Sequence, residues 1–254
     1  MESRLNGMFK NERHAFILKQ INLHNKVLSS HLSKQLEVSE DTVRRDLAEL
    51  ADAGEIIKVH GGALSKSYHH PIQHTSVYAQ MEKKMIAKKA INFIQNGMVI
   101  LTEAGTTMLE MVRLIPDNIE ATFFTVSPLM ALELAEHPLL TVILLGGQID
   151  NSAQITIGEK TISELAEIRA DLCFLGVNAL NAKVGLTEDD WKVAQVKKAM
   201  INCASKLVVL SISEKLNSEH KMRLCSTHSI DYLITELEPN DKTLAPYRKN
   251  THLV

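Results

Sequence analysis

From residue 98 onward the chain alternates between short apolar runs and amphipathic runs of helical length. An apolar run of about four to eight residues is typical of a strand buried on both faces, and strands separated by helices pair in parallel. The pattern predicts an α/β fold with a mostly parallel sheet and helices on both faces. The expected strands are residues 98–103, 121–127, 140–147, 172–177, 206–212 and 231–235, and the expected helices are 81–95, 108–115, 129–136, 160–168 and 189–204.

The first part of the chain follows a different pattern, in which apolar residues recur at helical spacing. Short helices with tight connections are the expected result. The predicted elements are helices at 12–24, at 29–36 and from near Ser39 to Gly54, followed over 55–64 by two short strands around a turn at His60, Gly61 and Gly62.

A polar segment that contains Pro71 separates these two patterns. Such a composition is typical of a linker. The predicted organisation is therefore a small N-terminal domain at residues 1–64, a linker at 65–78 and an α/β domain at 79–254.

The third predicted helix directs two arginines away from its apolar face. Its buried side is centred near Val43, and at about 100° per residue Arg45 falls about 200° from Val43, with Arg44 on the flank. Ser39 is placed as the N-cap. A short helix that follows another after a tight connection, and projects Thr42, Arg44 and Arg45 outward, has the geometry of a helix that enters the major groove of DNA.

Arginine suits such a position because its planar guanidinium reaches phosphate oxygens or guanine edges. The following hairpin, with Lys58 and His60, would lie beside the duplex as a wing. The charge balance argues the other way, because residues 1–65 hold nine Lys or Arg and nine Asp or Glu, and DNA-binding surfaces are ordinarily basic. From these residues alone, a DNA-binding helix and an ordinary solvated helix both stay open.

Residues 103–107 follow the first predicted strand of the α/β domain and open its next helix. The sequence Glu-Ala-Gly-Thr-Thr offers backbone N–H groups at a helix start, two hydroxyls and a glycine, which together suit a phosphate group. The same residue types also cap an ordinary helix, so a purely structural role stays open. The candidate ligand-binding residues of this loop are Glu103, Ala104, Gly105, Thr106 and Thr107.

Small or polar residues end several other predicted strands. Ligands of open α/β sheets bind at the carboxyl ends of the strands, so these residues are expected to gather there. Lys215 would supply a positive charge for a phosphate or a sugar oxygen, although an exposed surface lysine is the alternative. The further candidates are Thr125, Ser127, Gly146, Gly147, Gly176, Asn178 and Lys215.

The stretch SSHLSKQLEVSEDTVRRDLAELADAGEIIKVHGGA, residues 29–63, resembles the winged helix-turn-helix of the DeoR family of bacterial transcription regulators. Within it, VSEDTVRRDLAEL is similar to that family's recognition helix and HGGA to its wing. The resemblance implies that the N-terminal domain binds double-stranded operator DNA. The residues expected to contact DNA are Ser39, Thr42, Arg44, Arg45, Lys58, His60 and Gly61.

From Met81 to about Thr235 the chain also resembles the sensor domain of that family, which is similar in fold to ribose-phosphate isomerases and glucosamine-phosphate deaminases. The matching pieces are MEKKMIAKKA, AGTT, LLGGQ, FLGVNALNAKVGLT followed by VKKAM, and SEK. The resemblance implies a repressor of carbohydrate-metabolism genes whose operator binding is controlled by a phosphorylated sugar or related metabolite. A pseudo-palindromic operator would require at least a dimer, so a homodimer or homotetramer is expected.

Three positions depart from the family pattern. Glu103 stands where the family usually has an aspartate, and Val126 replaces the asparagine of a Thr-Asn-Ser sequence. The acidic residue that usually precedes the late Ser-Ser-Lys is absent from residues 211–215. These changes fall at positions that would recognise the hydroxyls of a sugar, so the sequence leaves the identity of the effector open.

Two other functions compete with this interpretation. An active sugar-phosphate isomerase or deaminase needs carboxylates near the carbon that loses its proton, but the loop after residues 172–177, acidic in the related enzymes, has no Asp or Glu before Glu188. We therefore expect no enzymatic activity. Metal sensing through His69, His70 and His74 is the other alternative, although no fourth ligand is suggested nearby.

The composition is that of a globular protein in a reducing compartment. The chain has 254 residues, 45% of them hydrophobic, and a net charge of −2, so a polyanion would have to bind a local patch. The three cysteines, at 173, 203 and 225, form no C-x-x-C pair. No apolar run is long enough to span a bilayer and the N-terminus is polar, so we expect a cytoplasmic protein without a membrane partner. No nucleotide-binding fingerprint occurs, and no cofactor is expected.

Overall fold

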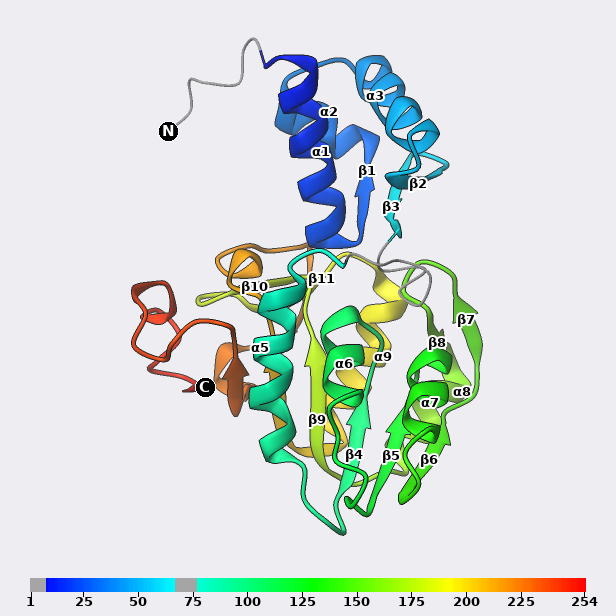
Figure 1. Ribbon diagram of the computed structural model, residues 1–254, viewed down its shortest axis with the longest axis vertical. Coiled ribbons are helices and arrows are strands. Elements are labelled where there is room, and N and C mark those ends of the chain that lie inside the picture. Colours follow the sequence, from blue (N-terminus) through cyan, green and yellow to red (C-terminus); the bar gives the residue numbers. More distant parts are fainter. Residues whose placement is uncertain (1–7, 67–76) are drawn as a thin grey trace. The chain divides into compact units, whose positions relative to one another are not determined.

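A computed structural model of the chain describes residues 8–66 and 77–254. Contacts within the chain divide it into two compact units, Met1–Tyr78 and Ala79–Val254, each with its own hydrophobic core. In Figure 1 the first unit runs from blue to cyan and the second from teal to red. The segment predicted as a linker lies mostly outside the described residues, and its first two residues belong to the first unit.

Within its described residues, the first unit contains three helices and a three-stranded antiparallel sheet in the order β1-β3-β2. Apolar side chains from all three helices share one core, including Ile21, Leu32 and Leu47. The second predicted helix coincides with α2, and the predicted hairpin forms around His60 and Gly61. The elements are α1 (Lys10–His24), β1 (Lys26–Leu28), α2 (Ser29–Leu36), α3 (Glu40–Asp52), β2 (Ile56–Val59) and β3 (Gly62–Ser65).

Strand β1 is a feature that the sequence does not predict, because three residues are too few to show a strand period. A glycine allows β1 and β3 to approach each other. A Cβ atom on Gly62 would collide with the carbonyl oxygen of Val27, so no other residue fits there without movement of the backbone.

A buried ion pair joins α1 to α3. Arg13 donates from Nε and Nη2 to the two carboxylate oxygens of Asp46, at 2.6 and 2.9 Å, and His14 Nε2 lies 3.1 Å from Asp46 Oδ1. Burial alone would raise the pKa of Asp46, but the hydrogen bonds and charges of Arg13 and His14 outweigh it and leave that pKa lowered. The bidentate contact holds α3 in a defined position on α1.

The second unit is built on a seven-stranded sheet in the order β15-β14-β12-β9-β4-β5-β6, and each neighbouring pair is parallel. The predicted fold class is therefore confirmed. The strands are β4 (Val99–Thr102), β5 (Ala121–Thr125), β6 (Leu140–Leu144), β9 (Ala170–Gly176), β12 (Ala204–Leu210), β14 (Tyr232–Ile234) and β15 (His252–Leu253).

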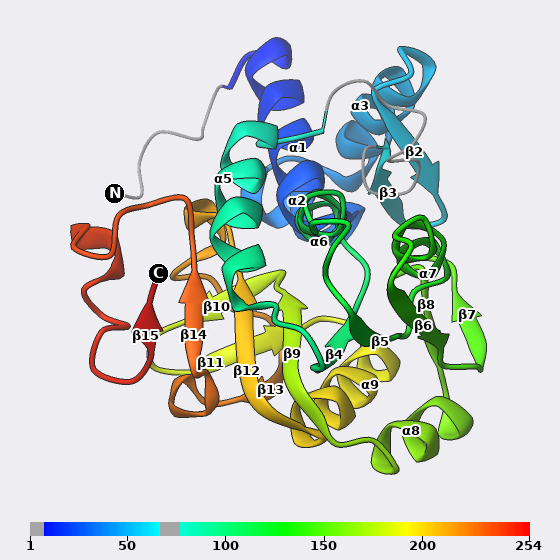
Figure 2. The same cartoon turned by 60° about the horizontal axis from the view of Figure 1, so that its bottom comes forward.

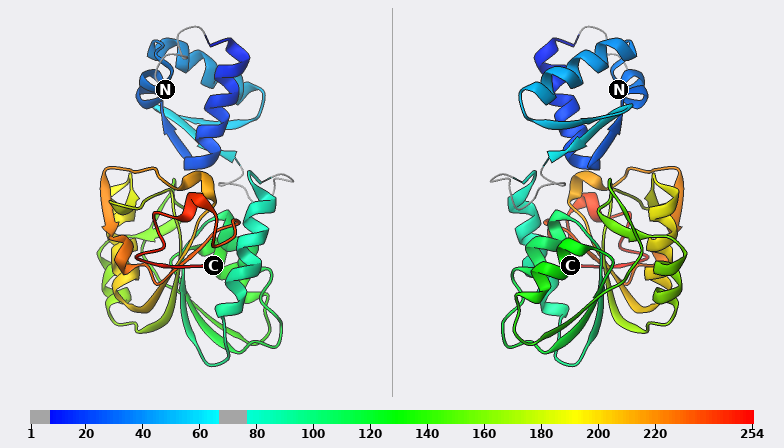
Figure 3. Two further views of the ribbon diagram at one scale, coloured as in Figure 1. Left: turned by 90° about the vertical axis from the view of Figure 1, so that its left-hand side faces the viewer. Right: turned by 90° about the vertical axis from the view of Figure 1, so that its right-hand side faces the viewer.

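Helices cover both faces of this sheet. Helices α5, α6 and α7 lie on one face, and α8 and α9 lie on the other (Figures 1 and 2). The side views of Figure 3 show the sheet between these two layers. The helices are α5 (Gln80–Ala90), α6 (Thr106–Val112), α7 (Pro128–Ala135), α8 (Glu159–Ala166) and α9 (Trp191–Asn202), with 3-10 turns η1 (Ile91–Phe93), η2 (Ser213–Lys215), η3 (Thr227–Ser229) and η4 (Lys242–Leu244).

The order of the strands reverses near the centre of the sheet. From β4 the chain adds β5 and β6 toward one edge, whereas from β9 it adds β12, β14 and β15 toward the other. Strands β4 and β9 are neighbours. The topological switch point, where open α/β sheets bind their ligands, is therefore at the carboxyl ends of β4 and β9.

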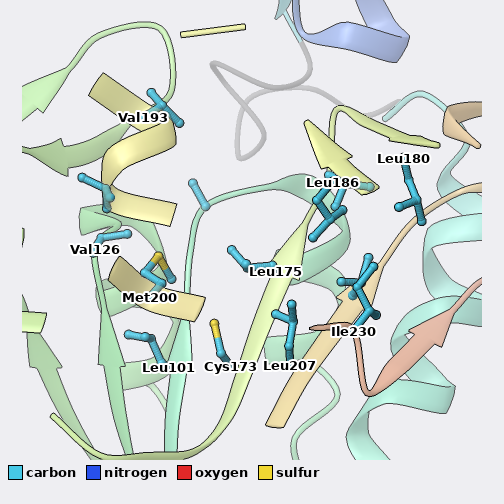
Figure 4. Close-up of a cluster of buried hydrophobic side chains, with 14 of the residues drawn as sticks. Leu101, Val126, Cys173, Leu175, Leu180, Leu186, Val193, Met200, Leu207 and Ile230 are labelled. Carbon is cyan, nitrogen blue, oxygen red and sulfur yellow. The ribbon is translucent and has the colours of Figure 1, made fainter. Parts of the chain in front are cut away.

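The larger core lies between the sheet and α9. Val193 and Met200 of α9 belong to the same buried cluster as the sheet residues Leu101, Cys173 and Leu207 (Figure 4). Full burial of an apolar side chain of this size stabilises the fold by about 1.5–3 kcal/mol. This packing fixes the position of α9 behind the switch point.

Two smaller antiparallel sheets extend the second unit, and the sequence does not predict them because their strands are only three or four residues long. The hydroxyl of the fully buried Tyr247 joins one of them to the segment after η2, since it donates to Leu180 O and accepts from Asn217 N, both at 3.0 Å. The strands are β10 (Ala179–Asn181), β11 (Gly185–Glu188) and β13 (Met222–Cys225) in one sheet, and β7 (Gln148–Asp150) and β8 (Ile155–Ile157) in the other.

Candidate functional site

Helix α3 presents the arginine pair to solvent. Ser39 Oγ caps the helix by accepting from Thr42 N at 3.2 Å, and it lies 2.9 Å from the Thr42 hydroxyl. Val43 is fully buried, whereas Arg44 and Arg45 are exposed. The helix therefore has the orientation that its periodicity predicts.

The two arginines differ in how they are held. Arg44 donates to Asp41 Oδ1 at 3.1 Å and to Glu40 Oε2 at 3.4 Å. Arg45 donates from Nε to the Asp41 carbonyl at 3.3 Å, and within residues 8–66 and 77–254 no carboxylate forms an ion pair with it. Because acidic neighbours already offset the charge of Arg44, Arg45 has the greater attraction for a polyanion.

The hairpin after α3 carries the remaining candidates of the first unit. Lys58 on β2 is exposed, as are His60 and Gly61 in the turn. Gly61 has a φ of +76°, a left-handed conformation that glycine adopts readily and that a type II turn places at its second central residue. The turn and the helix are thus both solvent-accessible parts of one small unit.

At the switch point of the second unit, the structure brings together three predicted residues. Glu103 directly follows β4, while Gly176 and Asn178 lie at the end of β9. The Glu103 carboxylate accepts a hydrogen bond from the Gly176 backbone. A Cβ atom on Gly176 would lie 3.4 Å from Glu103 Oε1, so the glycine permits this approach.

Lys197 on α9 lies between two glutamates. Its Nζ is 3.3 Å from Glu103 Oε2 and 2.9 Å from Glu188 Oε2, and all three side chains are more than nine-tenths buried. Glu188, the last residue of β11, also accepts from Asn178 Nδ2 at 3.3 Å and from Asp189 N at 2.9 Å. Two buried carboxylates therefore share one ammonium group.

Two further lysines add positive charge near the Glu103–Lys197–Glu188 cluster. Lys83 on α5 is buried, and Glu110 is the opposing charge that acts on it most strongly. Lys215, at the end of η2, is half-buried, and the charges of Lys83 and Lys197 act on it. In the described part of the chain, no group accepts a hydrogen bond from Lys215 Nζ.

Burial moves several of these groups toward neutral pH. It raises the pKa of Glu103 to about 7, with Lys197 opposing the shift and Glu188 adding to it. It lowers the pKa of Lys215 to about 7, and the like charges of Lys83 and Lys197 lower it further. It also lowers the pKa of Lys83 to about 8, against the attraction of neighbouring carboxylates. Perturbed groups gathered at a strand-end site are typical of functional sites.

The Glu103–Thr107 loop lies partly open to solvent. Gly105, with a φ of +134°, is the N-cap of α6, and apart from its two chain neighbours no described residue has an atom within 4 Å of where its Cβ would be. Ala104 is buried, whereas Thr106 and Thr107 are half-buried. Neither threonine caps α6, and among the described residues neither hydroxyl has a hydrogen-bond partner.

Two other candidates have hydroxyls that are used by the fold itself. Thr125 Oγ1 accepts from Ser127 N at 3.1 Å and from Thr102 Oγ1 at 3.4 Å. Ser127 Oγ caps α7 by accepting from Met130 N at 3.4 Å. Both side chains are fully buried, and these hydrogen bonds do not reach the Glu103–Lys197 pair.

The glycines after β6 shape the turn to β7. Gly146 N donates to Glu164 Oε2 at 2.9 Å, and the Gly146 carbonyl accepts from Thr161 Oγ1 at 2.8 Å. Gly147 has a φ of +153°, and a Cβ there would collide with the Thr161 hydroxyl. These contacts join β6 to α8 and do not involve the lysines of the switch point.

Sequence reasoning missed Lys83, Glu188 and Lys197 as members of the site. For Lys197 a signal exists, because it is four residues from Val193 and three from Met200 and so occupies the apolar face of its helix. Lys83 has the same kind of position on α5. A lysine on a buried helix face requires a charged partner or a ligand.

Two expectations concern absences or residues without a description. The histidines at 69, 70 and 74 lie outside the described residues, and within the described ones no three His, Cys, Asp or Glu side chains form a group that could hold a metal ion. No helix in residues 8–66 or 77–254 has the length and apolar character needed to cross a membrane.

Comparison with known proteins supplies the family. The DeoR C terminal sensor domain matches residues 79–237, and the DeoR-like helix-turn-helix domain matches residues 13–68. The HTH-type transcriptional regulator GlpR of Haloferax volcanii is 34% identical over 211 residues, 81% of each chain. The HTH-type transcriptional repressor GlcR of Bacillus subtilis is 29% identical over 236 residues, 92% of this chain and 91% of the relative.

Among solved structures, ribose 5-phosphate isomerase A of Methanocaldococcus jannaschii matches 53% of each chain with 19% identity and a TM-score of 0.39. A likeness of that degree carries no argument about activity. The sensor-domain match alone covers more than half of the chain, and the helix-turn-helix match covers most of the first unit. The chain therefore belongs to the DeoR family of transcriptional regulators.

Proposed function

We propose that this regulator represses genes of carbohydrate metabolism and that a phosphorylated sugar or related metabolite, bound at the switch point, controls its binding to double-stranded operator DNA. The observation that carries the proposal is the Lys215 ammonium group. It lies at the carboxyl end of β12, close to two like charges, and has no partner among the described residues. A bound anion would satisfy it.

The distribution of charge in the cluster supports an anionic ligand. Glu103 and Glu188 both contact Lys197, and the charge of Glu110 acts on Lys83, whereas among the described residues no carboxylate contacts Lys215. A phosphate dianion would supply Lys215 with negative charge and several acceptor oxygens. Lysine binds phosphate as a compact charge with three donors, which suits a ligand that enters from solvent.

The free hydroxyls of the Glu103–Thr107 loop support the phosphate more specifically. Thr106 and Thr107 lie at the start of α6 with their side chains unpaired within the described residues, and Gly105 leaves space beside them. In this proposal the Asn178 amide, which has both a donor and an acceptor, is assigned to a sugar hydroxyl. Glu103, which is buried against Lys197, is assigned to holding that lysine in position. The remaining predicted residues, at 125, 127, 146 and 147, take supporting roles at strand ends in this proposal.

For DNA, the proposal assigns the groove contact to Arg45 with Thr42 and the flanking Arg44, and assigns backbone contacts to Ser39 and the hairpin. Arg45 is exposed and free of carboxylate partners in the described chain. A recognition helix that reads half-sites of a two-fold operator works in a two-fold protein, so the proposal includes a homo-oligomer. It also places the protein in the cytoplasm, where its DNA is.

An isomerase or deaminase is the competing proposal, and one observation favours it. The pKa of Glu103, raised to about 7, suits a general base. Against it, Glu103 is 4% exposed and its carboxylate is held by Lys197 and the Gly176 backbone. We therefore propose binding without turnover, which incubation with candidate sugar phosphates and assay of the products would check.

A thermal-shift screen tests the effector assignment. Phosphorylated sugars are compared with the same sugars without phosphate, on wild type and on Lys215→Met. A true ligand stabilises by mass action, by about 2.7 kcal/mol at a hundredfold excess over its Kd. We expect the phosphorylated form alone to raise the Tm of wild type, and Lys215→Met to lose the shift. Equal shifts in both proteins would remove Lys215 from the site.

A further inference from the structure

Strand β6 is an outer strand of the large sheet, and its free edge is unprotected. Within the described residues it pairs with β5 alone. Its sequence, Leu-Thr-Val-Ile-Leu, has no charge and no proline, which are usual means of blocking further pairing at a sheet edge. The opposite edge is formed by β15, which is only two residues long. The two edges of the sheet therefore differ, and β6 is the one available for pairing.

Apolar side chains surround this edge. Of the ten large apolar side chains that the described residues expose, five lie on α7, β6, β7 and the turn before β6. Figures 1 and 2 show α7, β6 and β7 together at one side of the second unit. Such a concentration marks an interaction surface rather than scattered surface residues. This surface, called the β6 patch, comprises Leu132, Leu139, Ile143, Leu144 and Ile149, with exposed fractions of 69, 50, 38, 45 and 51%.

The backbone of β6 shows which groups face outward. Leu145 N donates to the Thr125 carbonyl at 2.9 Å, so Leu145 directs its backbone groups toward β5. Successive residues of a strand direct these groups to opposite sides. Val142 and Leu144, at odd spacing from Leu145, therefore direct their N–H and C=O groups away from β5.

These outward groups are symmetric about Val142. The next outward residue on the other side is Leu140, whose N–H is already donated to His137 O at 3.4 Å but whose carbonyl points to the edge. When a second β6 runs antiparallel, the two Val142 residues exchange their N–H and C=O groups. Each Leu144 N–H then donates to the Leu140 carbonyl of the other copy. A strand with this pattern is complementary to itself under a two-fold rotation.

We infer that β6 pairs with β6 of a second copy about a two-fold axis, so that one sheet continues across a homodimer and the β6 patch is covered. This inference rests on the proposed function only for the expectation of a homo-oligomer. Its tests measure mass in solution and need neither operator nor effector. An oligomer that does not depend on β6 would leave the proposed regulation standing, whereas a monomeric wild type would also remove the homo-oligomer from it. The failure of the proposed effector leaves the dimer standing.

Sedimentation velocity of the full chain over a concentration series gives the dimer dissociation constant. Leu144→Lys places a charge in the β6 patch, and we expect it to raise that constant at least tenfold. Met85→Lys is the matched control, because Met85 on α5 is 46% exposed and lies outside the patch; it should leave the constant unchanged. A monomeric wild type, or dissociation by Met85→Lys but not by Leu144→Lys, overturns the inference.

Discussion

Lys197 Nζ lies 2.9 Å from Glu188 Oε2 in a part of the molecule where both side chains are more than nine-tenths buried. Such a pair adds little net stability, because both ions lose their hydration, but the loss of one partner leaves an uncompensated charge. The cluster around Lys197 is therefore more sensitive to single substitutions than its small net contribution suggests.

The first prediction follows from this sensitivity. Lys197→Met should lower the free energy of unfolding by about 3–5 kcal/mol, because Glu103 and Glu188 are left buried without their cation. Urea unfolding of wild type and variant measures the difference. Glu188→Gln combined with Lys197→Met removes one of the two unpaired buried carboxylates and should recover part of the lost free energy of unfolding. A loss below about 1 kcal/mol for the single variant would contradict the deep ion pair.

The second prediction concerns the pH dependence of effector binding. The pKa of Lys215 is lowered to about 7 without ligand, and a bound anion favours the charged form, so binding takes up a proton. Affinity should therefore be highest below pH 7 and fall as pH rises, by up to about tenfold per unit. Phosphate is already a dianion above about pH 6.5 and does not contribute to this fall. Calorimetric titrations between pH 7 and 9 measure it.

Lys215→Arg is the control for that profile. A guanidinium group stays charged throughout this range, so the affinity of this variant should fall less steeply than that of wild type, since only the nearby Lys83, whose pKa is lowered to about 8, still loses its charge. A wild-type affinity that is flat between pH 7 and 9 would mean that Lys215 does not carry the contact.

The third prediction separates the DNA surface from the rest of the first unit. Arg45→Ala should remove specific operator binding while leaving the fold intact, since the loss of one bidentate base contact costs about 1–3 kcal/mol. Lys19→Ala removes the same charge from the exposed side of α1 and should leave specificity nearly unchanged. Operator titrations of both variants at matched salt provide the comparison. Wild-type affinity in Arg45→Ala would exclude that face of α3 from the groove.

The fourth prediction concerns the Glu103–Thr107 loop, where the phosphate of the effector is proposed to bind. Thr106→Val removes a hydroxyl that is unpaired within the described residues, and it leaves the first unit untouched. The variant should bind operator normally and lose its response to the effector. Thr122→Val makes the same change at a half-buried position on β5, away from the carboxyl ends of the strands, and should respond like wild type. Equal responses of the two variants would show that the phosphate does not bind at the Glu103–Thr107 loop.

The fifth prediction concerns acid stability of the first unit. The pKa of Asp46 is lowered in the folded chain, so its contribution is present above its unfolded pKa of about 3.9 and is lost as pH falls through the folded value. Asp46→Asn should cost about 1.5–3 kcal/mol at neutral pH, because the charge-assisted hydrogen bonds from Arg13 weaken. The penalty should shrink below about pH 4. Denaturant unfolding of the two proteins across this range checks the sign.

Much of the architecture is predictable from the sequence because it rests on local patterns. Helix α2 matches its predicted bounds, and Ser39 caps α3 as expected. The central apolar strands β4 and β9 are found because both of their faces are buried, whereas β6 is equally apolar but exposes Ile143 and Leu144 at the edge of the sheet. The short strands β1, β10 and β13 are not, because three or four residues show no period and their pairing depends on distant partners.

The candidate site shows the same division. Glu103, Gly176 and Asn178 are predicted from their places at strand ends, which sequence alone indicates. Glu188 and Lys197 are missed because their role comes from packing: α9 crosses behind the sheet and inserts a lysine between two carboxylates from different strands. The apolar face around Lys197 is the one signal that the sequence offers.

The pairing of β4 with β9 has a consequence for how the chain acquires its structure. It is marked by Asp171, whose carboxylate accepts from Val99 N at 2.8 Å across 72 residues of sequence. Contacts between such distant segments form slowly, because closing a long loop costs conformational entropy before the contact can stabilise the chain. The first unit joins segments that are closer in sequence. A newly made chain can therefore complete its helix-turn-helix while Glu103 and Lys197 are still far apart.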